Sequence, residues 1–304
     1  ALPISANATS AGWGNAGGGA TQALMPLMLS AIVMYGVEQS MGWRAALIVP
    51  GFMMLIVGCL YWKFTQDCPA GNYKQLREQG IEVEGGKKGG WAIIKEASRN
   101  YRVWILFVSY AACFGIEIFM HNVVTMYYVQ KFNFGLKEAG MAAGIFGLLA
   151  LFARAFGGII SDKVALKRGL DARTEILFMM ILGEGLFLML FSQMNTPVMA
   201  ILSMTLFGLF THMACGATYA LVPFIDRKAL GGVAGIIGAG GNVGAVAAGF
   251  IFKSMPDLQT CLLSLGIMVV VIGCVVLFIR FSPEHKAREK QLFEKALLER
   301  NEAV

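Results

Sequence analysis

Long apolar stretches alternate with short polar connections along nearly the whole chain. Each stretch holds about 20 residues, the length at which an α-helix crosses roughly 30 Å of hydrocarbon. Eight such stretches can be delimited, at 8–36, 43–64, 102–129, 139–160, 175–194, 197–222, 232–253 and 259–281. Transmembrane β-strands would instead require short segments of alternating polarity, which the sequence lacks. The pattern therefore predicts an all-α membrane protein with eight membrane-spanning helices.

Composition supports this prediction, because 57% of the 304 residues are hydrophobic and only 14% are charged, against about a quarter in a typical soluble protein. Most of the 25 basic residues lie in the connections after the second, fourth and sixth stretches and in the C-terminal tail. Basic residues collect in this way on the cytoplasmic side of membrane proteins. We therefore expect the central connection and the C-terminus in the cytoplasm, with the protein in the plasma membrane. The net charge of +6 then needs no nucleic-acid partner to explain it.

Two of the apolar stretches carry nearly the same glycine and asparagine pattern. It reads Gly12-Trp13-Gly14-Asn15-Ala16-Gly17 in the first stretch and Gly238-Ala239-Gly240-Gly241-Asn242-Val243-Gly244 in the seventh. Small residues allow close helix packing, which is one explanation of the pattern. A side-chain amide in the hydrocarbon region, however, is costly unless it faces protein, water or a ligand. Because Asn15 and Asn242 hold equivalent positions, we expect both to line a pore between two repeated halves.

The segment 65–100 is polar and contains several glycines, so it is predicted to be a cytoplasmic linker between two helix bundles. If the repeated motifs hold the same place in each half, the first lies in the fifth of six spans. Eight of twelve transmembrane helices would then be present, in the six-plus-six plan of the major facilitator fold. We expect residues 1–64 to be the last two spans of the N-terminal bundle. The predicted remainder is a C-terminal six-helix bundle at 101–282 and a charged, helical cytoplasmic tail at 283–304.

Arg154 lies well inside a predicted span, about two turns before the polar pair Asp162-Lys163. A guanidinium at that depth is unfavourable unless it is solvated or paired. One interpretation is that it extends to the interface or pairs with an acid from another helix. The other is that its planar set of donors, which match the oxygens of a small anion, makes it the fixed positive charge of an anion site.

The third stretch contains an acidic residue, Glu117, on the same helical face as Tyr110 and Phe114. Glu117 has two interpretations: a proton-carrying carboxylate, or a structural hydrogen-bonding group. Tyr110 offers a hydroxyl in a helix that we expect to line a cavity, so it is a further candidate for contact with a ligand. A second intramembrane acid, Glu184, is expected to be structural.

These segments together resemble the nitrate/nitrite porter family of the major facilitator superfamily, and most closely its eukaryotic high-affinity branch. The two glycine–asparagine motifs are similar to the paired nitrate signatures of that family. The segment Phe152-Ala153-Arg154-Ala155-Phe156-Gly157-Gly158, with Ser161-Asp162-Lys163, is similar to its eighth helix and the following loop.

The resemblance implies a set of functional residues. Arg154 would be one of two arginines that grip the anion, and Asn15 and Asn242 would lie beside the substrate. Gly12, Gly14, Gly238 and Gly241 would form the surrounding walls of the signatures. Asp162 and Lys163 would belong to a cytoplasmic gating loop, and Glu117 is the candidate for coupling.

The expected function is secondary active transport of nitrate, with nitrite as a further substrate, by alternating access and with proton coupling. Inward movement of an anion opposes a negative-inside potential by roughly 2.3 kcal/mol per charge per 100 mV, so uptake needs co-transported cations or an exchanged anion. Two alternatives remain, a carrier for another small anion such as formate or oxalate, and a membrane nitrate sensor. The expected partners are nitrate or nitrite, protons and the lipid bilayer, and an accessory subunit is left open. The sequence contains no pattern typical of a metal site, a cofactor site or an enzyme.

Overall fold

The computed structural model describes residues 39–67, 71–80 and 90–302, which are helical along most of their length. Within them, seven helical segments are long and apolar enough to cross a membrane: Arg44–Phe64, Tyr101–Phe132, Leu136–Arg168, Asp171–Gln193, Pro197–Phe224, Leu230–Ser254 and Leu258–Val276. Each overlaps one of the stretches predicted from hydropathy. The remaining prediction, at 8–36, lies outside the described residues, as do its candidates Gly12, Gly14 and Asn15.

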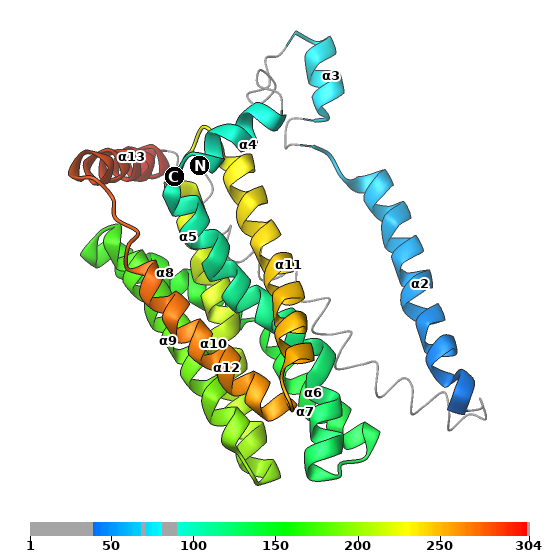
Figure 1. Cartoon of the computed structure of the whole chain (residues 1–304). Helices are drawn as coiled ribbons and strands as arrows, with labels where there is room; N and C mark the ends of the chain where they lie inside the picture. The colour runs from blue at the N-terminus through cyan, green and yellow to red at the C-terminus, as the bar shows by residue number, and fades with distance from the viewer. Residues whose placement is uncertain (1–38, 68–70, 81–89, 303–304) are drawn as a thin grey trace.

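Six of these spans pack into one bundle (Figure 1). Its helices are α5 (Tyr101–Tyr110), η1 (Ala111–Gly115), α6 (Ile116–Phe132), α7 (Leu136–Leu149), α8 (Ala153–Arg168), α9 (Asp171–Gln193), α10 (Pro197–Leu221), α11 (Leu230–Ser254) and α12 (Leu258–Val276). Helix α10 is the central one, because it contacts α5 to α9 and is buried without interruption over residues 211–218. The seventh span, within α2 (Gln39–Phe64), lies apart from the bundle and is only 6% buried.

Two of the spans are interrupted near their middle. The span that begins with α5 contains a single π-helical turn, η1, before it continues as α6. The following span was predicted as one helix over 139–160, but its α-helical hydrogen bonding is broken at 150–152, between α7 and α8. Here each backbone N–H bonds to the carbonyl three residues earlier, as from Phe152 to Leu149. Neither interruption contains proline, so hydropathy and helix-breaker patterns gave no sign of them.

Glycines bring helix backbones into direct contact at several crossings, two of which involve the helices that carry the interruptions. A Cβ atom added at Gly157 of α8 would collide with the carbonyl oxygen of Met213 on α10, and one added at Gly216 would collide with that of Arg154. At the second crossing, a Cβ on Gly244 of α11 would collide with the carbonyl oxygen of Ala111 in η1. Residues without side chains are required at such close approaches. The two crossings fix how α8 and η1 lie against their neighbours.

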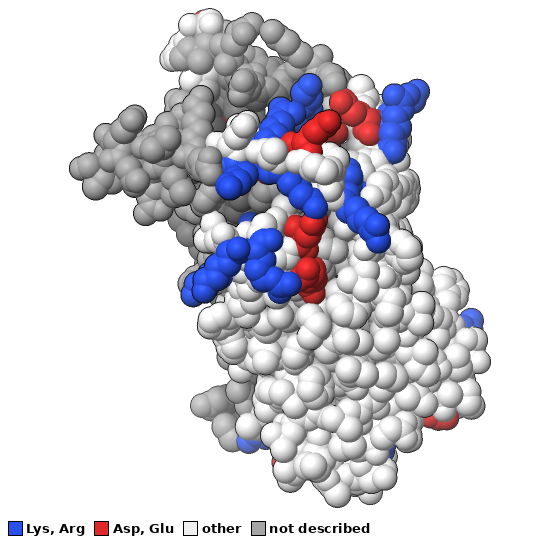
Figure 2. Space-filling view, turned by 90° about the vertical axis from the view of Figure 1, so that its left-hand side faces the viewer, with Lys and Arg blue, Asp and Glu red and all other residues white. Residues whose placement is uncertain are grey.

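Charged side chains gather at one end of the bundle, above a broad uncharged band (Figure 2). The terminal helix α13 (Pro283–Glu302) lies at this end and is helical as expected from the sequence. It is fastened there by ion pairs of Lys286 with Asp171 and of Arg227 with Glu289. The segment predicted as a linker also contains helix, namely α3 (Tyr73–Glu78) and α4 (Gly90–Ser98), of which α4 packs against α11. The division of the chain into parts of two bundles remains a prediction.

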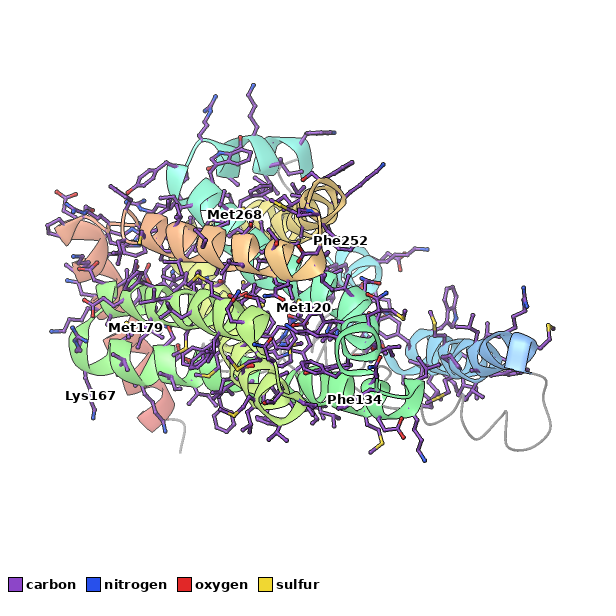
Figure 3. The ribbon with its side chains drawn as sticks, turned by 60° about the horizontal axis from the view of Figure 1, so that its bottom comes forward. Met120, Phe134, Lys167, Met179, Phe252 and Met268 are labelled. Atoms are coloured by element: carbon purple, nitrogen blue, oxygen red, sulfur yellow. The ribbon has the colours of Figure 1, made fainter. Side chains whose placement is uncertain are left out.

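The interior of the bundle is filled by apolar side chains, which Figure 3 shows as sticks between the helices. Met120 is fully buried there, whereas Met179 is 53% exposed on the outer surface of α9. Exposed large apolar residues of this kind occur on most of the spans, which suits surfaces that face lipid. The polar groups inside this apolar interior are therefore few and need an explanation.

We predict that Gly157→Val lowers the unfolding free energy by roughly 1–3 kcal/mol, because its side chain would be forced against the backbone of α10, which cannot relax as a side chain can. Gly249→Ala is the matched control, since a Cβ at Gly249 meets no described atom within 4 Å. Thermal denaturation of the two purified variants in detergent makes the comparison. Equal midpoints for both variants would contradict the close contact between α8 and α10.

Candidate functional site

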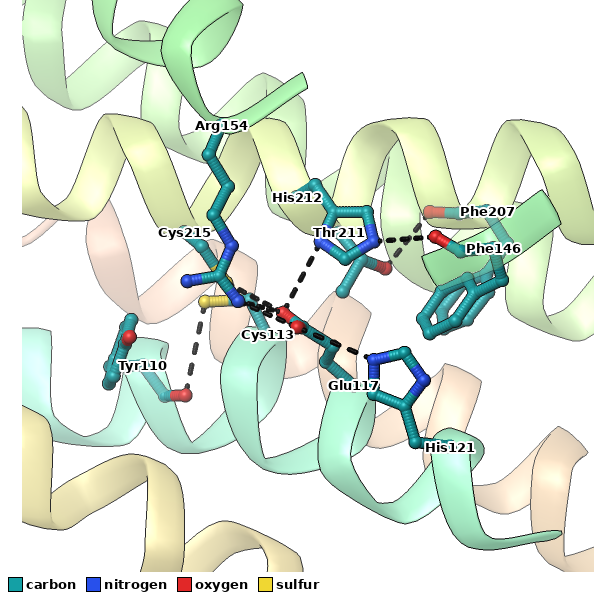
Figure 4. Close-up of polar contacts among 10 residues, drawn as sticks. All are labelled: Tyr110, Cys113, Glu117, His121, Phe146, Arg154, Phe207, Thr211, His212 and Cys215. Carbon is teal, nitrogen blue, oxygen red and sulfur yellow. Dashed lines mark hydrogen bonds and ion pairs between the residues drawn. The ribbon is translucent and has the colours of Figure 1, made fainter. Parts of the chain in front are cut away.

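A buried ion pair joins two spans inside the bundle (Figure 4). Nη2 of Arg154, on α8, lies 2.6 Å from Oε1 and 2.5 Å from Oε2 of Glu117, on α6. Their side chains are only 2% and 5% exposed. Charges are costly to bury unless they are paired and hydrogen-bonded, so each of these residues stabilises the charge on the other.

The interruptions of the two spans lie directly before this pair. Glu117 is the second residue of α6 and follows the π-helical turn η1, and Arg154 is the second residue of α8 and follows the break at 150–152. The contact of Gly216 with the Arg154 carbonyl brings the start of α8 against α10. An irregular turn therefore precedes each of the two charged residues, and a glycine contact holds the helix of Arg154 against α10.

Three further polar side chains surround the Glu117 carboxylate. His212 Nδ1 and Cys215 Sγ, both on α10, lie 3.4 Å and 3.6 Å from Oε2. His121 Nε2, one turn along α6, lies 3.7 Å from Oε1. The other ring nitrogen of His212, Nε2, is 3.0 Å from the carbonyl oxygen of Phe146 on α7. Because that oxygen can only accept, Nε2 must carry a proton and Nδ1 is the nitrogen turned toward Glu117.

Aromatic rings cover the other side of Arg154. Its guanidinium carbon lies 5.2 Å from the centre of the Phe114 ring, within the range of cation–π attraction. Phe114 stacks on Tyr110 at 5.0 Å, and Tyr110 meets Tyr219 edge-on at 5.1 Å. A Cβ at Gly241 of α11 would collide with Phe114, so this glycine makes room for the aromatic layer. Arg154 Nε is buried and has no hydrogen-bond partner among the described residues.

The structure brings three of the predicted site residues together, namely Arg154, Glu117 and Tyr110, and places Gly241 next to them. Gly238 faces the hydroxyl of Tyr219. Asn242 is exposed and lies on a different face of α11 from the packed Gly240 and Gly241, so the described residues leave it open rather than near Arg154.

The two candidates for a gating loop, Asp162 and Lys163, lie within the second half of α8 and not in a loop, because the helix continues to Arg168. Asp162 pairs with Arg173 in the first turns of α9, with Nη1 and Oδ1 2.5 Å apart, and Lys163 is exposed. Their contacts join α8 to α9 and do not reach the buried cluster. A role in gating remains a prediction for both.

The first interpretation of Arg154 had two forms, and the structure excludes extension to the interface, because the side chain is buried in the bundle. The other form, pairing with an acid from another helix, is what occurs. This ion pair is compatible with an anion site, because the Nε atom of Arg154 has no hydrogen-bond partner among the described residues. Sequence reasoning missed His121, His212 and Cys215. Only His121, four residues after Glu117, had a signal in the helical spacing.

The cluster can hold a small anion and exchange protons. Arg154 supplies a permanent positive charge with a planar set of donors, while Glu117 and the two histidines can gain and lose protons. In the described part of the chain, no group of three or more His, Cys, Asp and Glu side chains is arranged to hold a metal ion. The chemistry available here is therefore ion binding and proton transfer.

Comparison with known proteins provides independent evidence for the family of this chain. The family model described as Major Facilitator Superfamily matches residues 2–225. The chain is 36% identical over 279 residues to High affinity nitrate transporter 2.5 of Arabidopsis thaliana, an alignment that covers 91% of this chain and 55% of the relative. It is also 36% identical over 285 residues to Nitrate transporter 2.2 of Chlamydomonas reinhardtii, again covering 91% and 55%.

A more distant relative is Nitrate/nitrite transporter NrtP of Nostoc punctiforme, 24% identical over 339 residues that cover 90% of this chain and 67% of the relative. The chain spans about half the length of the first two relatives, at 55% each. Its helical fold, its membrane spans and the family match agree with one another. The chain therefore belongs to the Major Facilitator Superfamily.

Proposed function

We propose that the protein transports nitrate, and nitrite as a second substrate, across a membrane, with Arg154 as the residue that binds the anion. The proposal rests first on the names of the similar proteins, which are nitrate transporters in plants and algae and a nitrate/nitrite transporter in a cyanobacterium. The observation that carries it in this chain is a buried guanidinium, 2% exposed, whose Nε–H is left without a partner among the described residues.

The size and planarity of nitrate suit the surroundings of Arg154. Planar oxyanions match the in-plane donors of a guanidinium, and the ring of Phe114 lies 5.2 Å from its carbon atom and limits the space beside it. Backbone contacts at Gly157 and Gly216 limit the space on the α10 side. A small monovalent anion would neutralise the guanidinium without the extra charge and volume of a tetrahedral oxyanion.

Transport requires that the buried cluster open to each side in turn. The aromatic layer and the α8–α10 contacts enclose Arg154 in this structure, so an anion reaches it only when helices move. Alternating access by rocking of two helix bundles supplies such a movement in major facilitator proteins. In this proposal the face of α11 that carries Asn242, which the described residues leave open, lines the path between the bundles.

Proton coupling would supply the driving force. Entry of an anion against a negative-inside potential costs roughly 2.3 kcal/mol per charge per 100 mV, so accumulation needs an accompanying cation. Protonatable groups already surround the proposed anion site, with Glu117 in contact with Arg154 and two histidines within 3.7 Å of the carboxylate. In this proposal the linker and the tail face the cytoplasm, as the positions of the basic residues indicate, and the membrane is the plasma membrane.

A carrier for a small carboxylate such as formate is a second candidate function. The observation that favours it is Glu117 itself, because a carboxylate group fits against the Arg154 guanidinium in this structure. Formate presents the same two oxygens as that side chain. The two candidates differ in which free anion binds best to the same residue.

We predict that Arg154→Lys lowers nitrate affinity by about tenfold to a hundredfold, because the substitution keeps the charge but removes the planar set of donors, whose charge-assisted hydrogen bonds contribute about 1.5–3 kcal/mol. Nitrate uptake into proteoliposomes and calorimetric binding by the longest natural form of the protein measure the loss. Arg168→Lys is the matched control, since Arg168 is 64% exposed and pairs with Glu175 at the surface. Full-rate uptake by Arg154→Lys would refute the role of Arg154.

We also predict that an excess of unlabelled nitrite suppresses uptake of labelled nitrate more strongly than formate does, and that phosphate leaves it nearly unchanged. Nitrite shares the small size and single charge of nitrate, whereas phosphate is tetrahedral and more highly charged. The measurement is competition at equal anion concentrations in the same proteoliposomes. Inhibition by formate that exceeds inhibition by nitrite would favour the carboxylate carrier.

A further inference from the structure

The protein's own carboxylate holds one nitrogen of the guanidinium to which the proposed function assigns the transported anion. Both oxygens of Glu117 lie within 2.6 Å of Arg154 Nη2. A carboxylate and nitrate are both planar, singly charged groups whose oxygens accept hydrogen bonds in one plane. An incoming anion and Glu117 cannot both hold this nitrogen in the same way, so the two compete for it.

Removal of Glu117 from Arg154 is unfavourable while the carboxylate is charged. The side chain is 5% exposed and lies in an apolar interior, where an ionised group without its partner is strongly destabilised. A proton on the carboxylate removes this penalty, because a neutral carboxylic acid needs only one acceptor for its hydrogen. Release of Arg154 is therefore linked to protonation of Glu117.

His212 is positioned to deliver that proton. Its Nε2–H is held by the carbonyl oxygen of Phe146 at 3.0 Å, which leaves Nδ1 facing Oε2 of Glu117 at 3.4 Å. If neither atom carried a proton, two lone pairs would face each other. The arrangement is stable either as an imidazolium beside a carboxylate or as a neutral imidazole beside a carboxylic acid. If the imidazole and the carboxyl group move slightly closer together, their contact becomes a hydrogen bond.

The remaining charged and titratable neighbours of Glu117 come from each helix packed around it. They are Arg154 on α8, His121 on α6, Cys113 on η1, Cys215 on α10 and Glu184 on α9. Arginine and the two histidines favour the ionised form of Glu117 as long as Arg154 has no other anion. An anion on Arg154 cancels the positive charge of the guanidinium and so favours the neutral form of the acid.

We propose that Glu117 is a built-in competitor for Arg154, displaced by the transported anion only when Glu117 accepts a proton from His212. This inference rests on the proposed function. In the step, the Nδ1–H bond of the imidazolium breaks, an O–H bond forms at Oε2, and the bonding electron pair stays on Nδ1. The neutral imidazole keeps its Nε2–H on Phe146 and accepts the new O–H at Nδ1. The imidazolium is formed by a proton from the open side before this step, and Glu117 releases that proton on the other side when it returns to Arg154, so one anion and one proton enter together.

The test is nitrate binding as a function of pH in wild-type protein and in Glu117→Gln, measured by calorimetry on the longest natural form of the protein. Wild-type affinity should fall by about tenfold per pH unit on the alkaline side, as expected for one linked proton. Glu117→Gln resembles the neutral acid, so its affinity should be independent of pH. At alkaline pH it should exceed wild-type affinity by about tenfold or more, the effect of one pH unit of linkage.

The control is Glu175→Gln. Glu175 is an acid at the surface of the bundle, with a side chain that is 48% exposed and pairs with Arg168. Its variant should keep the pH dependence of wild-type binding. His212→Gln separates proton delivery from binding: it should slow proton-driven uptake by about tenfold or more while nitrate–nitrate exchange continues.

If Glu117→Gln fails to fold, infrared difference spectroscopy of the wild-type protein tests whether nitrate binding protonates Glu117. Addition of nitrate at neutral pH should produce the carbonyl stretch of a protonated carboxylic acid, and the band should persist in Glu175→Gln. Nitrate binding without that band, or with an affinity independent of pH, would overturn the competition and leave the proposed function intact. A wild-type protein that binds no nitrate would overturn both.

Discussion

The ion pair between Arg154 and Glu117 is the interaction on which the rest of this bundle depends. Two charges lie in an interior built almost entirely of apolar side chains, and each is tolerated because the other is present. Such a pair contributes little to stability when compared with apolar packing of the same volume. Its presence supports the use that we propose for the charges, the binding of an ion.

The surrounding structure holds the two charges at a fixed separation. A π-helical turn precedes Glu117, and a break in the next span precedes Arg154. Each of the two side chains therefore lies directly after an irregular turn of its span. Glycine contacts press α8 against α10 and α11 against η1, and they leave no room for rotation of the helices at these points. Irregular turns of this kind are frequent at functional sites, where a side chain must be re-aimed. The proposed transport would therefore require the packed helices themselves to move.

Much of the fold could be predicted because its causes are local. Hydropathy located the spans well, as for 197–222 against Pro197–Phe224 and 232–253 against Leu230–Ser254. For Arg154 the sequence left extension to the interface, pairing and anion binding open, because a charged residue in an apolar run must be solvated or paired. What could not be predicted depends on contacts between distant segments. The pairing of Arg154 with Glu117, and of Glu117 with His212, follows from helix packing that no spacing within one helix encodes.

The glycine–asparagine motif illustrates the same limit within a single helix. The sequence indicated that α11 has a small-residue surface, and Gly240, Gly241 and Gly244 do pack against η1 and its aromatic layer. The adjacent face with Asn242 is left open by the described residues. Periodicity identifies the two faces but cannot say which of them packs against the bundle.

The central claim, that Arg154 holds the transported anion, is tested most directly by solid-state NMR on protein with isotope-labelled arginine and labelled nitrate. Dipolar recoupling between the nitrate nitrogen and an arginine guanidinium carbon should appear in the wild-type protein, and the signal should vanish in Arg154→Lys. A nitrate–arginine coupling that persists in Arg154→Lys, or bound nitrate with no arginine in contact, would contradict the account.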